Sequence, residues 1–116
     1  MSRLTGLLID PHLCRAEVVR FAPDLAEFYR LLQTDRIAGF ADEEHGLSYT
    51  LLDEVAEDER AIVFCRGWDY PVRGRVLVTG LSSCEIGHRS LSVPQLEWCR
   101  AAHHVGWITP NGIKLL

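Results

Sequence analysis

Apolar residues occur in short runs along this chain, and the runs predict strands more often than helices. Residues 4–9 are almost continuously apolar and end at Asp10-Pro11. This pattern predicts a central strand that is buried on both faces and stopped by a turn. Residues 16–21 alternate between apolar and polar positions, so we expect them to pair with the first strand as a hairpin.

The same patterns predict further strands downstream. Residues 37–41 and 47–52 flank a polar turn that ends at Gly46, and glycine supplies the positive φ that such turns need. Residues 61–65 and 75–79 are two more expected strands, separated by a loop over residues 67–71. We expect a weaker strand within residues 84–91.

The first expected helix follows Pro23, which suits a first helical position because its φ is already restricted. An apolar stripe then recurs at helical spacing. The stripe consists of Leu25, Phe28, Tyr29 and Leu32.

The second expected helix begins at a capping box formed by Ser92 and Gln95, in which each side chain bonds the backbone N–H of the other residue. We expect this helix to reach residue 103 or 104. Gly106 is then its predicted C-terminal stop.

These elements predict an α+β fold with a largely antiparallel sheet packed against two helices, because strands outnumber helices and connections are short. No Gly/Ser linker or internal repeat interrupts the 116 residues, so we expect one domain over residues 1–116. The chain is 47% hydrophobic and 24% charged, which is ordinary globular composition. It is long enough to bury a core without disulfides or metals.

The apolar stretch near the start is interrupted by Asp10 and is too short for a secretory signal or a membrane span. We therefore expect a cytoplasmic protein that does not contact a membrane. In that reducing compartment the cysteines are expected to be free thiols. They are Cys14, Cys65, Cys84 and Cys99.

Charge is distributed unevenly along the chain. Residues 1–59 hold 13 acids and 5 bases, whereas residues 60–116 hold 3 acids and 7 bases. The acids gather in two predicted turns, around residues 42–44 and 53–59. Such runs are usually solvated, but a clustered negative field can also dock a basic partner or imitate nucleic-acid phosphate. The candidate interface residues of these turns are Glu43, Glu44, Glu57, Asp58 and Glu59.

Arginines and aromatic residues alternate directly downstream, a mixture that single-stranded nucleic-acid binders use. The net charge of −4 disfavours that function, because an autonomous phosphate binder is normally basic. We instead expect this segment to serve a protein interface, with two aromatic side chains either exposed as anchors or tucked against the sheet. Its candidate residues are Arg66, Trp68, Tyr70 and Arg73, and nucleic-acid binding through Arg66, Trp68, Arg73 and Arg75 remains the alternative.

Cys84, His88, Cys99 and His103 form two C-x3-H patterns, and two thiolates with two imidazoles can make a tetrahedral zinc site. On a helix, Cys99 and His103 are about 6 Å apart and can share a metal. The ends of an extended segment over residues 84–88 are about 13 Å apart, so both cannot ligate one zinc unless Gly87 makes a turn. We therefore favour buried cysteines and a helix-terminal histidine, and we expect no cofactor.

Two segments resemble motifs of a known family. They are Leu7-Leu8-Ile9-Asp10-Pro11 and residues 71–80, PVRGRVLVTG. They resemble a family of small domain-of-unknown-function proteins encoded by bacteriophages, prophages and plasmids, often from actinobacteria. Its members share a strand ending in I-D-P, a helix, the motif P-x-x-G-[KR]-x-L-V-x-G, a polar stretch and a final helix. The polar stretch departs from this pattern, because it holds Cys84 and His88 where members more often carry Asp and Glu.

The resemblance brings no catalytic residues, and the chain contains neither a G-x-S-x-G motif nor a phosphate-binding glycine loop. It implies a mobile-element accessory protein that modulates host or defence machinery by binding, in a bacterial cell or an infected host. The sequence therefore predicts a non-enzymatic protein-binding module. It leaves open a homodimer, a single-stranded nucleic-acid binder and a small zinc protein.

Overall fold

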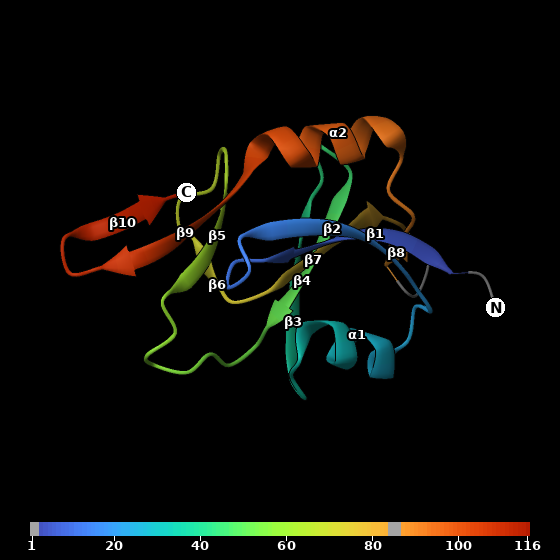
Figure 1. The fold of residues 1–116 in the computed structure, drawn as a ribbon. Coiled ribbons are helices and arrows are strands. Elements are labelled where there is room, and N and C mark those ends of the chain that lie inside the picture. The colour runs from blue at the N-terminus through green and yellow to red at the C-terminus, as the bar shows by residue number, and fades with distance from the viewer. Residues whose placement is uncertain (1–2, 84–86) are drawn as a thin grey trace.

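The larger of two antiparallel sheets lies between the two helices, with α2 (Val93–Ala102) over one face and α1 (Leu25–Leu32) over the other (Figure 1). The computed structural model describes residues 3–83 and 87–116. This sheet has the order β2-β1-β7-β4-β3, with β8 added beside β7. Its strands are β1 (Leu4–Asp10), β2 (Arg15–Phe21), β3 (Ile37–Asp42), β4 (Leu47–Leu52), β7 (Val76–Leu81) and β8 (His88–Arg89). The predicted α+β fold is confirmed.

The smaller sheet has the order β10-β9-β5-β6. Its strands are β5 (Ala61–Cys65), β6 (Val72–Arg73), β9 (His103–Thr109) and β10 (Gly112–Leu115). In Figure 1 the β9–β10 hairpin extends away from the larger sheet. No helix in the described part of the chain is long and apolar enough to cross a membrane.

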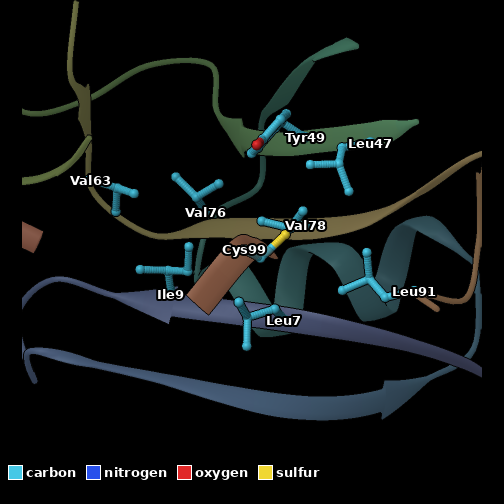
Figure 2. Packing of buried hydrophobic residues seen from close by; sticks show 9 residues of the cluster. All are labelled: Leu7, Ile9, Leu47, Tyr49, Val63, Val76, Val78, Leu91 and Cys99. Atoms are coloured by element: carbon cyan, nitrogen blue, oxygen red, sulfur yellow. The ribbon is translucent and has the colours of Figure 1, made fainter. Parts of the chain in front are cut away.

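Two hydrophobic clusters hold the layers together, one on each face of the larger sheet. Figure 2 shows the cluster beneath α2, in which neighbouring strands contribute Leu7, Val78 and Tyr49 and the helix contributes Cys99. The second cluster packs Phe28 and other α1 residues against the opposite face. Consecutive strand residues point to opposite faces, so burial of both faces explains the near-continuous apolar runs of β1 and β7.

The first helix begins two residues later than Pro23, because Asp24 is its N-cap and accepts a hydrogen bond from the Glu27 N–H at 2.9 Å. The predicted stripe is wrong at one position. Leu25 is 58% exposed, and Leu31 is buried instead. The helix is short, and only its later turns reach the sheet.

The second helix has the predicted capping box between Ser92 and Gln95, but it ends at Ala102. The expectation that Gly106 stops this helix is wrong, because His103 already begins β9 and Gly106 lies within that strand. A Cβ at Gly106 would come within 2.6 Å of the Lys114 carbonyl oxygen of β10. This glycine therefore permits a close approach of two strands.

The strand expected over residues 75–79 is shifted and lengthened to Val76–Leu81, and a further short strand precedes it. Val72–Arg73 belongs to the smaller sheet and Val76–Leu81 to the larger one. Gly74 lies between them with φ +83°, a left-handed conformation that favours glycine and turns the chain from one sheet into the other. The weaker strand is present as β8, and residues 84–86 of its expected range lie outside the described residues.

Candidate functional site

The turn after β3 and the loop after β5 line a common groove of about 600 Å³. Asp42, Glu44 and His45 line it from the turn, and Arg66, Trp68 and Tyr70 line it from the loop. We call it the Glu44–Tyr70 groove. It brings together an acidic turn and an Arg/aromatic loop that are more than twenty residues apart in sequence.

Hydrogen bonds fix the shape of the turn. Asp42 Oδ1 accepts the backbone N–H of His45 at 3.2 Å, and Asp42 Oδ2 lies 2.7 Å from His45 Nδ1. Gly46 closes the turn with φ +66° and donates its N–H to the Glu43 carbonyl at 3.4 Å. The carboxylate of Asp42 thereby orients the imidazole of His45.

Helix α2 holds this turn in place. The side-chain nitrogen of Gln95 donates to the carbonyl oxygens of Gly46 at 2.8 Å and His45 at 3.2 Å, while its side-chain oxygen accepts the Ser92 N–H. The His45 ring also stacks on the Trp98 ring, with centroids 3.9 Å apart. The capping box therefore has a second role, because it anchors the acidic turn to the helix.

Aromatic rings make the floor of the groove. Trp68 is half-buried and meets Phe40, Tyr49 and His103 edge-on, with centroid distances of 5.5, 5.2 and 5.8 Å. Phe40 stacks on Tyr49 at 4.8 Å. Of the two predicted anchors, only Tyr70 is fully exposed, at 81%, whereas Trp68 is tucked against the sheet. Burying the large indole stabilises the floor.

A buried series of hydrogen bonds lies behind this floor. The Nδ1 of His103 is 2.8 Å from the Cys99 carbonyl oxygen, which can only accept, so Nδ1 carries the proton. Its Nε2 accepts the hydroxyl of Tyr49 at 2.8 Å. Burial lowers the pKa of His103 against the opposing effect of this carbonyl, and burial above all raises the pKa of Tyr49. Both groups are therefore neutral near pH 7.

Two thiols next to these hydrogen bonds are unreactive, because burial disfavours their charged form as well. Cys65 and Cys99 are both buried. Burial raises the pKa of Cys65 and raises that of Cys99 to about 12. Because the thiolate is the nucleophile, these cysteines are structural hydrophobes. The arrangement is suited to binding rather than to nucleophilic chemistry at these thiols.

The groove itself carries an excess of negative charge. Asp42, Glu44 and Asp69 line it together with a single arginine, Arg66. Among residues 3–83 and 87–116, Asp42 contacts His45, whereas Glu44, Asp69 and Arg66 have no ion-pair partner within 4.0 Å. The unpaired carboxylates favour a cation as ligand.

Asp42, Glu44 and His45 are the groove residues that could hold a metal ion, because their ligand atoms lie within 4.8 Å of one another. The bond between Asp42 and His45 Nδ1 accounts for part of this proximity without an ion. Glu44 is exposed, and exposed carboxylates commonly lie this close without a metal.

The predicted interface residues separate into several places. Glu44, Arg66, Trp68 and Tyr70 line the groove, whereas Glu43 lines a different hollow with Arg89. Glu57 and Asp58 are exposed between β4 and β5, Glu59 bonds His12 at 2.9 Å, and Arg73 is exposed on β6.

The two acidic turns do not form one edge. They lie at opposite ends of the hairpin formed by β3 and β4, because Asp42 pairs with Leu47 whereas Ile37 pairs with Leu52, the residue before the second turn. Six residues of strand separate them, or about 20 Å at roughly 3.3 Å per residue.

The four residues of the nucleic-acid alternative do not form one exposed surface. Arg75 is bonded to Asp10 at 2.9 Å, and Trp68 belongs to the aromatic floor. Arg66 and Arg73 remain exposed. The ring of Trp68 and one of the three cations, Arg75, therefore make contacts within the fold.

The predicted zinc ligands are also divided. Cys84 lies outside the described residues. His88 Nδ1 is 2.7 Å from Thr79 Oγ1, and its ring contacts Phe28 on the α1 side. Cys99 packs on the α2 side, where its cluster includes Val78, the residue before Thr79. Consecutive residues of a strand point to opposite faces, so the sheet separates His88 from Cys99 and His103.

A scan against protein-family models, a search of curated proteins and a search of solved structures each return no match for this chain. The groove residues that sequence reasoning missed include Phe40, Asp42, His45 and Asp69. A local signal existed for two of them, because an aspartate three residues before a histidine in a tight turn can bond both its backbone and its ring. Phe40 reaches the groove through strand pairing, which has no local signal.

Proposed function

We propose that this protein is a protein-binding module that docks a cationic side chain of a partner protein in the Glu44–Tyr70 groove. The observation that carries the proposal is an unpaired Glu44 carboxylate in the same groove as the exposed ring of Tyr70. A lysine or arginine bound there gains a charge-assisted hydrogen bond from the carboxylate and a cation–π contact from the ring.

The rigidity of the groove supports this function. The acidic turn is tied to α2 by Gln95, and the floor is a packed cluster of rings. A preformed site loses less conformational entropy when it binds, so that a small contact area can give useful affinity. The resemblance of two segments to mobile-element accessory proteins fits such a module, which would modulate host or defence machinery by occupying a protein surface.

The test uses a random dodecapeptide display library panned on the whole chain. We expect the enriched peptides to contain a lysine or arginine, and their affinity is measured by fluorescence anisotropy. Glu44→Arg is expected to weaken binding by about tenfold or more, which corresponds to about 1.4 kcal/mol. Glu43→Arg is the matched control, because it makes the same charge change one residue away but lines a different hollow.

Equal loss of affinity in Glu43→Arg and Glu44→Arg would mean that only the overall charge matters. That result, or a library from which no peptide is enriched, contradicts the proposal. A salt-dependent shift with a single-stranded oligonucleotide that Glu44→Arg strengthens would favour the nucleic-acid alternative.

A further inference from the structure

Strand β3 forms one free edge of the larger sheet. It runs over six residues, Ile37–Asp42, and within residues 3–83 and 87–116 it pairs only on its β4 side. In Figure 1 it is the strand next to α1 at the border of the sheet. An edge strand presents unpaired N–H and C=O groups along its outer side, and these can pair with another extended chain.

The register shows which backbone groups face outward. Asp53 donates its N–H to the Arg36 carbonyl at 3.2 Å, so this pair is hydrogen-bonded and the pairs that follow alternate. Residues 38, 40 and 42 therefore direct their N–H and C=O groups toward β4. Ile37, Gly39 and Ala41 direct theirs to the free edge, and no described residue bonds them there.

This edge lacks the features that usually block strand pairing. The first five residues of β3 include no charged residue and no proline. The opposite edge strand, β2, carries Arg15, Glu17 and Arg20, and the edge strands of the smaller sheet have two and four residues. Charge and shortness are the common protections of sheet edges, so β3 is the least protected long edge in the described structure.

Grooves lie on both faces of this edge. On the α2 face is the Glu44–Tyr70 groove, which Phe40 and Asp42 help to line. On the α1 face is a second groove of about 610 Å³, which we call the α1 groove; it is lined by Leu25, Phe28 and Gly39 among others. A strand added to β3 directs alternate side chains to opposite faces. Its side chains would therefore enter the two grooves in turn.

We propose that the partner segment binds as an added β-strand along β3, with apolar side chains in the α1 groove and a lysine or arginine in the Glu44–Tyr70 groove. This inference rests on the proposed function and specifies the conformation of its ligand. The main chain of the segment bonds to Ile37, Gly39 and Ala41. The pattern of side chains then confers specificity, as in other cases of strand addition.

Charge complementarity identifies a partner peptide rather than a second copy of this chain as the occupant. Antiparallel pairing of two copies would bring the end of one β3, with Asp42, Glu43 and Glu44, near the start of the other. The cation at that start, Arg36, already bonds Glu54 at 2.6 Å. A second copy therefore offers no free cation to the groove there, whereas a basic peptide does.

The experiment is an N-methyl scan of the tightest peptide from the library panning. Strand addition requires that every second peptide N–H donates to β3. We expect methylation at alternate positions to weaken binding by about tenfold or more, with little effect at the positions between. In the protein, Ala41→Pro removes one outward N–H and should weaken binding. Ala41→Val also enlarges the side chain but retains the N–H, so the difference in affinity between the two variants measures the loss of the backbone bond. Proline is tolerated on an edge strand, and thermal melting checks that the variant folds.

The outcomes separate this inference from the proposed function. Peptides that need Glu44 but show no alternation on methylation overturn strand addition and leave the groove as the binding site. If methylation weakens binding at alternate positions but Glu44→Arg has no effect, strand addition is supported and binding in the Glu44–Tyr70 groove is contradicted. A library that enriches nothing overturns both. A dimer of the free protein that Ala41→Pro dissociates, seen by light scattering, overturns the peptide occupant in favour of a second copy.

Discussion

Arg75 and Asp10 form an ion pair at one end of β1 and β7, two inner strands of the larger sheet, with Nη2 2.9 Å from Oδ2. Asp10 is 5% exposed, and its other carboxylate oxygen accepts the His12 N–H at 3.0 Å. The second guanidinium nitrogen of Arg75 donates to the Leu31 carbonyl in the last turn of α1 at 3.0 Å. One arginine therefore joins β7, the end of β1 and the end of a helix.

This contact joins two segments that are distant in sequence. Asp10 belongs to Leu7-Leu8-Ile9-Asp10-Pro11, and Arg75 belongs to the PVRGRVLVTG segment, residues 71–80. The two segments contribute most of the neighbouring strands β1 and β7, in which Ile9 pairs with Val76. Asp10 and Arg75 thus have a structural role, which is to bond each other.

Removal of one partner of this ion pair should destabilise the fold strongly, because the other charge would remain buried and unpaired. We expect Arg75→Met to lower the free energy of unfolding by about 3–5 kcal/mol. Urea unfolding followed by circular dichroism measures it. Arg73→Met is the control, since Arg73 is exposed two residues earlier and should change stability by less than about 0.5 kcal/mol. Equal effects of the two variants would contradict the assigned role of Arg75.

Stability should fall as the pH is lowered, because the fold buries neutral histidines. Burial lowers the pKa of both His103 and His88 from the ordinary value of 6.5. Below that value the unfolded chain binds a proton that the folded chain does not, so the free energy of unfolding decreases with decreasing pH. The contribution of these histidines to the free energy of unfolding is fully present above pH 6.5, and it is lost as the pH falls toward their lowered pKa values.

Urea unfolding at a series of pH values checks this dependence. His103→Gln is expected to reduce the slope below pH 6.5, while its side chain can still bond the hydroxyl of Tyr49. A slope that His103→Gln does not alter would show that other groups govern the acid response.

The described cysteines should differ sharply in reactivity. Cys14 is exposed, whereas Cys65 and Cys99 are buried with raised pKa values. We expect iodoacetamide to alkylate Cys14 in the native protein, and the two buried thiols on the order of 100-fold more slowly or only after unfolding. Peptide mapping by mass spectrometry resolves each site, with guanidinium-unfolded protein as the control. Rapid native alkylation of Cys99 would contradict the packing beneath α2.

Sequence patterns predicted the strands over residues 4–9, 16–21, 37–41, 47–52 and 61–65 because hydrophobic periodicity is local and reports directly which face of an element is buried. The capping box of Ser92 and Gln95 was predictable for the same reason, since both partners lie within one turn. The end of that helix was not, because His103 joins β9 through pairing with Cys65, a residue distant in sequence. Non-local hydrogen bonds outweigh local helix signals there.

The sequence by itself determined the α+β class, most of the strands and the presence of an acidic turn and an Arg/aromatic loop. Only the tertiary structure decided that Glu44 and Tyr70 share a groove, that Trp68 lies in its floor and that Glu57 lies at the far end of the hairpin from Glu44. Composition and periodicity are properties of neighbouring residues. A binding site depends on strand order and register, which bring together side chains that local patterns cannot relate.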